Sequence, residues 1–167
     1  ASFVDQTIAS LDTTLRIGDG PTTFSIGGGG YYGLLDGDAH HWGASVDLAV
    51  SRSFGDGWRT TGLLRAGTLR YEDDYSSLSV LEVDQQLAAF SLQRAGPAGH
   101  FGMTVFAGTE DPRETGSPYG NDRFGFQLQA GSQSAAGNGV QLQFAWQDVD
   151  YDDSPGFFLG TDRSDTF

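Results

Sequence analysis

The sequence predicts an all-β protein whose strands run antiparallel in up-and-down order, and three observations lead to this. Apolar and polar residues alternate along runs of about twelve residues between Trp42 and Tyr151, and such two-residue alternation is typical of strands with one apolar and one polar face. The connections between these runs are alternately short and long. No segment shows a convincing apolar stripe with the helical period of about 3.6 residues.

Glycine-rich turns mark the expected hairpins. Four such turns join strands in pairs, at residues 18–21, 55–57, 96–99 and 137–139. Longer loops separate the pairs, and the first of these carries Asp36, Asp38, His40 and His41. The expected strands therefore cover residues 3–17, 22–32, 42–54, 58–71, 83–94, 100–110, 124–134 and 140–150, and a ninth begins after residue 157. Together they form one domain over residues 1–167.

The two faces are clearest in the expected strand 42–54. Trp42, Ala44, Val46, Leu48 and Val50 fall on one side, and mostly small or polar residues fall on the other. Strands 100–110, 124–134 and 140–150 repeat this division. The polar side consists of Gly, Gln, Ser and Thr with few charges, whereas a soluble sheet usually presents Lys, Glu and Arg to water. This composition suits the lumen of a transmembrane β-barrel whose apolar side faces lipid.

Strand length and aromatic placement also favour a membrane barrel. The expected strands exceed the usual length of about 5–6 residues and suffice to cross a bilayer, which needs about 9–11 residues. Aromatic residues gather near the strand ends, as in the interfacial girdles of outer-membrane barrels. The girdle candidates are Trp42, Phe54, Trp58, Tyr71, Trp146 and Tyr151.

The order of turns and loops predicts an incomplete section of a barrel. Bacterial barrels have tight turns on the periplasmic side and long loops outside. The first expected strand enters a tight turn at Gly18, so it would run inward from the outer side. Single-chain barrels normally have both termini in the periplasm. We therefore expect eight or nine strands here and others elsewhere in the barrel.

A polar lumen is the candidate site. The residues expected to line it are Asp47, Arg59, Arg65, Gln127, Gln129, Gln141, Gln143 and Gln147. Arg65 belongs inside, because an arginine facing lipid at the membrane midplane costs about 2–4 kcal/mol. The glutamines of strands 124–134 and 140–150 are expected to pair across the strands. They either line a hydrophilic pore or pack the barrel wall.

The acidic residues gather on the side of the long loops. The chain has 22 acidic and 9 basic residues, a balance that argues against nucleic-acid binding. Oxygen-rich loops suit Ca²⁺ or Mg²⁺, and the weak calcium candidates are Asp36, Asp38, Asp150 and Asp152. None of these has the spacing of a calcium-binding loop. The prediction is therefore no dedicated metal site or cofactor, with solvated loops that contact lipopolysaccharide through occasional cations.

His40 and His41 lie beside two aspartates, and an Asp and His pair on a surface is able to activate water. Adjacent residues in a strand point to opposite faces, so only one histidine is expected to join such a site. The sequence contains no serine-nucleophile motif, phosphate-binding loop or zinc-ligand spacing. We therefore expect a protein that is not an enzyme.

Two segments carry a resemblance to a known family. Residues 105–112 read Val-Phe-Ala-Gly-Thr-Glu-Asp-Pro, and a second pattern runs from Tyr151-Asp152-Asp153 to residues 158–165. The region from Trp42 to Phe167 resembles the barrels that follow tetratricopeptide repeats in bacterial envelope proteins, and most of all the surface lipoprotein assembly modifier family. This porin-like resemblance implies an outer-membrane barrel that helps substrates reach the cell surface. Related barrels export polysaccharide.

The expected function is a transport or secretion conduit, or the membrane anchor of an export machine. Its partners would be membrane lipid, lipopolysaccharide and an exported protein or polysaccharide. A soluble β-sandwich or jelly-roll binding module would show the same alternation and remains an alternative. A structural barrel that associates with other subunits of a larger membrane complex is the third possibility.

Overall fold

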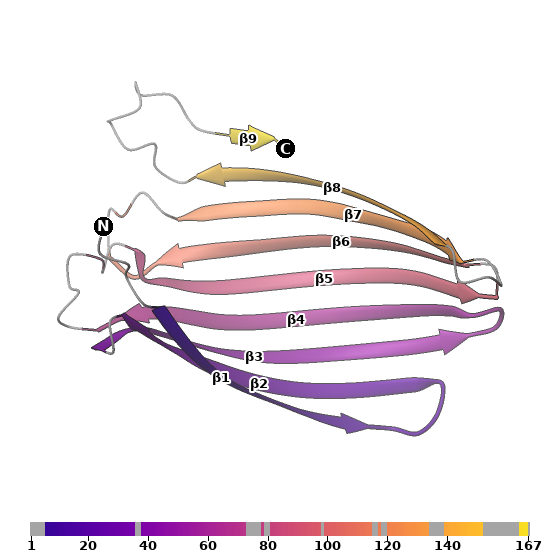
Figure 1. Cartoon of the computed structure of the whole chain (residues 1–167), viewed down its shortest axis with the longest axis horizontal. Coiled ribbons are helices and arrows are strands. Elements are labelled where there is room, and N and C mark those ends of the chain that lie inside the picture. Colours follow the sequence, from indigo (N-terminus) through magenta and orange to yellow (C-terminus); the bar gives the residue numbers. More distant parts are fainter. Residues whose placement is uncertain are drawn as a thin grey trace.

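The computed structural model describes residues 6–35, 38–72, 78, 81–97, 99–114, 117, 120–133, 139–151 and 164–166. These residues form one antiparallel sheet in which every strand pairs with its neighbours in the sequence (Figure 1). The strands are β1 (Gln6–Ile17), β2 (Thr22–Leu35), β3 (Asp38–Phe54), β4 (Trp58–Tyr71), β5 (Val83–Gly96), β6 (Gly99–Pro112), β7 (Asn121–Gln133), β8 (Gly139–Tyr151) and the short β9 (Ser164–Thr166). The predicted all-β, antiparallel, up-and-down fold is confirmed.

The strand connections divide into two ends. At the turn end, β1 connects to β2, β3 to β4, β5 to β6 and β7 to β8, and the other strands connect at the loop end. The turn between β3 and β4 has a local cause. Asp56 and Gly57 both have positive φ, at 61° and 77°, which aspartate and glycine tolerate best and which suits a tight hairpin.

One expected loop is wrong. The sequence pattern placed Asp38, His40 and His41 in a loop before Trp42, but β3 already begins at Asp38 and pairs there with the end of β2. The alternation of apolar and polar residues is interrupted at His40 by a register shift, and this irregularity hid the strand. Elsewhere the expected and observed ranges differ little, and those of β4 coincide. Residues 3–5 and Asp36 lie outside the described part.

The sheet is a single layer and it is not closed. β1 pairs only with β2, and β9 pairs with β8 only from Asp148 to Asp150. No second sheet stacks on either face within the described ranges. No helix among the described residues is long and apolar enough to cross a membrane.

Cross-strand pairs assign each side chain to one of two faces, because residues directly opposite each other in neighbouring strands point the same way. One row crosses the eight long strands and is apolar throughout. Its members are Ile17, Phe24, Val50, Gly62, Phe90, Val105, Phe126 and Trp146. We call the face that contains this row the apolar face, and the other the polar face.

The apolar face is exposed. Leu11, Leu142 and Val140 are 78%, 69% and 64% exposed, and many other large apolar side chains of this face are also open to the surroundings. Among the described residues, the only buried apolar side chains are Val83 and Val149. The sheet therefore does not fold around a conventional hydrophobic core, although burial of apolar surface is the main driving force for folding in water.

The polar face is crowded, and glycines make room on it. In several cross-strand pairs a large side chain lies over the glycine opposite it, so that an added Cβ would collide with that side chain. Such a Cβ would come within 2.5 Å of His100 at Gly131 and within 2.6 Å of Phe106 at Gly125. The other pairs of this kind are Asp12 with Gly29, Tyr31 with Gly43, His41 with Gly33, and Gln129 with Gly102. Many glycines thus serve side-chain packing within the sheet.

Candidate functional site

The eight residues expected to line a lumen all lie on the polar face. They come from β3, β4, β7 and β8, and the cross-strand register gives every one of them the same side of the sheet. The register also corrects one detail of the glutamine pairing. Only Gln129 and Gln143 are directly opposite each other, because Gln127 faces Ala145 and Gln141 faces Gly131.

An ion pair lies on the polar face between β3 and β4. Arg65 Nε donates a hydrogen bond to Asp47 Oδ1 at 2.5 Å. The carboxyl group of Asp12 on β1 also lies within electrostatic range of Arg65. The arginine expected on the lumen side is therefore balanced by acidic partners from two strands. Half of its side chain remains exposed, so it keeps N–H groups for further contacts.

A second polar cluster lies around Glu110 on β6. Gln85 donates to Glu110 Oε1 at 3.1 Å, and Asn121 donates to Glu110 Oε2 at 2.9 Å. Arg123 Nη1 lies 3.3 Å from Glu110 Oε1. Cross-strand pairing aligns this cluster with Ser45 and Asp12 in one row, which we call the central polar row. It comprises Asp12, Gly29, Ser45, Gly67, Gln85, Glu110, Asn121 and Tyr151.

Hydroxyl groups form a further row toward the turn end. Ser51 Oγ and Thr61 Oγ1 lie 2.9 Å apart, and Ser91 Oγ and Thr104 Oγ1 lie 2.9 Å apart in the same row. Their side chains therefore satisfy one another across the strands. The polar face as a whole offers hydrogen-bonding groups from β1 to β8, which is the chemistry expected of a surface in contact with water.

The two histidines contradict the expectation that they point to opposite faces. Gly33 pairs with His41, but the next pair joins Leu34 to Ala39, so that His40 is the extra residue of a β-bulge. The bulge brings the rings together, with their Nδ1 atoms 2.7 Å apart. Tyr71 packs against both rings, at centroid distances of 5.4 and 5.8 Å. Strict alternation fails wherever a bulge intervenes, and nothing in the sequence marked this one.

The aromatic girdle candidates divide between the faces. Trp42, Phe54, Trp58 and Trp146 lie on the apolar face. Tyr71 and Tyr151 lie on the polar face, because Tyr71 pairs with His41 and Tyr151 with Asn121. Position near a strand end does not determine the face, which depends on whether the residue number along the strand is odd or even.

The calcium candidates do not come together in the described structure. Asp38 begins β3 and Asp150 lies next to the last residue of β8, with four strands between β3 and β8. Asp36 and Asp152 lie outside the described residues. Within the part of the chain that is described, no group of three or more histidine and acidic residues could hold a metal ion.

Sequence reasoning missed a cluster around Glu82 at the loop end. This glutamate is buried, with 8% exposure, just before β5. Its Oε1 atom accepts a hydrogen bond from the Tyr71 amide at 3.1 Å, and its Oε2 atom lies 3.3 Å from Arg113 Nη1. Arg70 approaches it to 4.0 Å and also pairs with Asp84. The cluster connects the end of β4 to the start of β5 and to the start of the loop after β6. No local sequence pattern predicts these contacts.

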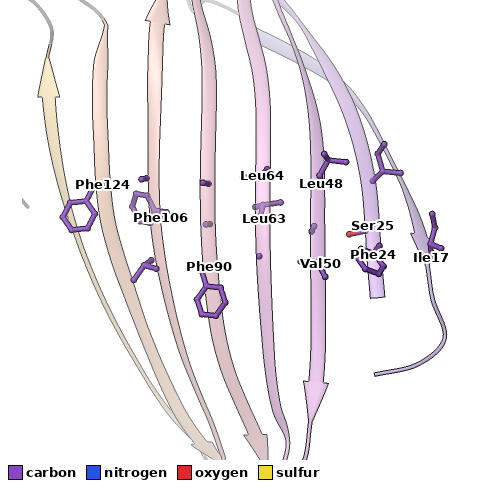
Figure 2. A pocket seen from close by; sticks show the side chains of 17 residues that line it. Ile17, Phe24, Ser25, Leu48, Val50, Leu63, Leu64, Phe90, Phe106 and Phe124 are labelled. Atoms are coloured by element: carbon purple, nitrogen blue, oxygen red, sulfur yellow. The ribbon is translucent and has the colours of Figure 1, made fainter. Parts of the chain in front are cut away.

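The apolar face carries a broad shallow hollow of about 920 Å³. Figure 2 shows Phe24, Phe90 and Phe124 around it, from β2, β5 and β7. The lining also includes small residues such as Gly62 and Ala88. A twisted sheet is saddle-shaped, so each face is concave along one diagonal. A shallow hollow on the apolar face is therefore consistent with the twist of the sheet.

Comparison with known proteins identifies no relative. No family model, curated protein or solved structure matches the chain. The resemblance to the surface lipoprotein assembly modifier family therefore stays a prediction, based on residues 105–112 and on the pattern that begins at Tyr151.

Proposed function

We propose that this chain forms part of the wall of a β-barrel in the bacterial outer membrane, and that the barrel is a conduit for polar molecules. One observation carries the proposal. The exposed side chains of the apolar face form a continuous belt, and this belt crosses the sheet at the angle expected for tilted barrel strands.

The border of the belt shifts steadily from strand to strand. At the loop end the border lies at Ala9 in β1 and at Trp146 in β8. Trp146 is in the same row as Ile17, so the border shifts by eight residues from β1 to β8. At the turn end the border lies at Ile17 in β1 and at Val140 in β8, and Val140 is six residues from Trp146, so the border shifts by six residues. Over seven strand-to-strand steps this is about one residue per strand. With about 3.4 Å per residue and about 4.8 Å between strands, the slant is about 35°.

Strands of outer-membrane barrels tilt by about 35–45°. A flat lipid layer therefore demands a belt that is oblique to the rows by the same angle. The height also agrees. From Trp42 to Val50 the belt extends about 27 Å along β3, which at this tilt gives about 22 Å, close to the apolar band of about 25 Å in such barrels.

The charged residues follow the same slant. Arg52 in β3 and Phe144 in β8 occupy one row of the apolar face, yet only Phe144 lies within the belt. Near the loop end, Ala44 in β3 shares its row with Asp84 and Asp111. A belt parallel to the rows would not place charged and apolar groups in the same row. A belt oblique to the rows does so, because each row crosses its border.

The open edges support closure by further strands. β1 has no partner on its outer side, and β8 has no second partner from Gly139 to Gln147 among the described residues. Unpaired backbone groups in hydrocarbon cost several kcal/mol each, so sheets cross membranes only as closed barrels. We infer that strands outside this sheet pair with both edges. The polar face then becomes the lining of the lumen, and its hydrogen-bonding rows support a water-filled path.

Single cysteines test which face meets lipid, since the chain contains no native cysteine. Spin labels are introduced at Val46, Asp47, Leu48 and Ala49, with Asp56 in the turn as a control, in the full polypeptide in lipid vesicles. Oxygen should raise the spin relaxation rate of the labels at the two apolar-face positions. A water-soluble nickel chelate should raise that of the labels at the two polar-face positions. Equal access of the chelate to all four positions would refute the membrane assignment.

Conductance tests the conduit. The purified polypeptide, incorporated into planar bilayers, should produce discrete steps of ion current. A protein that passes the labelling test but never conducts would be a membrane anchor and not an open path.

A further inference from the structure

We propose that a pit in the polar face binds a neutral sugar ring, so that the conduit carries or recognises saccharides. This inference rests on the proposed function, because it takes the polar face to be the lumen lining. The pit has a volume of about 270 Å³ and lies between β1 and β5. Its main walls are Asp12, Tyr31, Arg65, Leu69 and Gln85.

The floor of the pit is formed by glycine and other small residues. Ser45 stands between Gly29 and Gly67 in one row, so none of these floor positions carries a large side chain. The volume corresponds to roughly nine water molecules at about 30 Å³ each, which is comparable to one hexose ring. A ligand of that size fits there without movement of the strands.

One side of the pit is apolar and aromatic. The Tyr31 ring lies across Gly43, and Leu69 follows in the same row. The C–H groups on the face of a pyranose ring pack well against such a surface, because an aromatic ring offers a flat apolar face together with a polar edge.

The remaining sides are polar. Asp12 on β1 and Gln85 on β5 lie on opposite sides of the pit, both in the central polar row, and Arg65 lies one row nearer the turn end. Asp12 supplies acceptors and Arg65 supplies donors, while the amide of Gln85 supplies both. The hydroxyl groups around the edge of a sugar ring need this mixture of donors and acceptors, arranged around an apolar platform.

Charge selects against an anionic ligand. Arg65 is already paired with Asp47 and lies within electrostatic range of Asp12, so that the one cation is compensated by acidic groups. An anion would be repelled by these carboxylates. A hydroxyl-rich neutral molecule does not meet this cost.

The binding test uses the full protein in lipid nanodiscs with maltotriose as the probe, measured by isothermal titration calorimetry. Tyr31→Ala and Gln85→Leu should each weaken binding about tenfold or more, as expected when packing or a hydrogen bond is lost. Gln143→Leu, the same change on the polar face of β8 and outside the pit, should leave the affinity unchanged. Heat-modifiable migration on a gel verifies that each variant is folded.

Conductance separates this inference from the proposed function. In planar bilayers, maltotriose should interrupt the current of the wild type and do so at about tenfold higher concentration in Gln85→Leu. If maltotriose does not change the current and calorimetry detects no heat of binding, the proposed sugar site is wrong, whereas the proposed conduit is unaffected. Tighter binding of glycylglycine than of maltotriose would also overturn it, because the pit would then be a site for zwitterions.

Discussion

Leu64 and Val140 carry apolar side chains of similar exposure on the apolar face, at 58% and 64%, but the oblique belt puts them at different depths. Leu64 on β4 lies near the middle of the belt, and Val140 on β8 lies at its border toward the turn end. We predict that Leu64→Arg destabilises the protein in lipid by about 2–4 kcal/mol and that Val140→Arg costs about 0–1 kcal/mol. The first range corresponds to a loss of about 30- to 700-fold in the folding equilibrium.

The assay is reversible folding of the full polypeptide into phospholipid vesicles, titrated with guanidinium and followed by tryptophan fluorescence. The three tryptophans lie in β3, β4 and β8 and report on both halves of the sheet. Gln143→Arg on the polar face is the matched control and should remain close to the wild type. If the apolar face met water, the free energies of unfolding of Leu64→Arg and Val140→Arg would both lie within about 0.5 kcal/mol of the wild-type value. That result, or equal losses at Leu64 and Val140, would refute the membrane belt.

Three further predictions concern packing and charge. Gly33→Ala should lower the free energy of unfolding by about 1–3 kcal/mol, because the added Cβ would collide with the His41 ring. Gly28→Ala should be nearly neutral, because its added Cβ would meet no atom closer than 3.4 Å. Guanidinium titration compares the two variants. Glu82→Gln weakens the contacts with Arg113 and Arg70 and should speed hydrogen exchange at the Tyr71 amide, with unchanged exchange in the middle of β4 as the control. Arg65→Ala removes a positive charge from the polar face and should shift the reversal potential toward cation selectivity, and an unchanged potential would argue that Arg65 lies outside the conducting path.

The sequence determined the class of the fold because strand patterning is local. Alternation in β3, β7 and β8 assigned side chains to faces, and glycine-rich turns located the hairpins, since both signals depend on residues that are close in the chain. The same local reasoning put Asp47, Arg65 and the glutamines together on one face. It failed at His40 and His41, where the extra residue of a bulge reverses the alternation without any mark in the sequence.

Only the tertiary structure decided how the strands align, and the slant of the apolar belt and the lining of the pit depend on that alignment. A shift of one residue in register changes which side chains lie side by side, and no local pattern specifies it. The register gave the belt its slant of about 35°, brought Asp12, Tyr31 and Arg65 around one pit, and placed Glu82 between Arg70 and Arg113. These contacts join residues far apart in the chain, so they arise from strand pairing and packing and not from the preferences of any single segment.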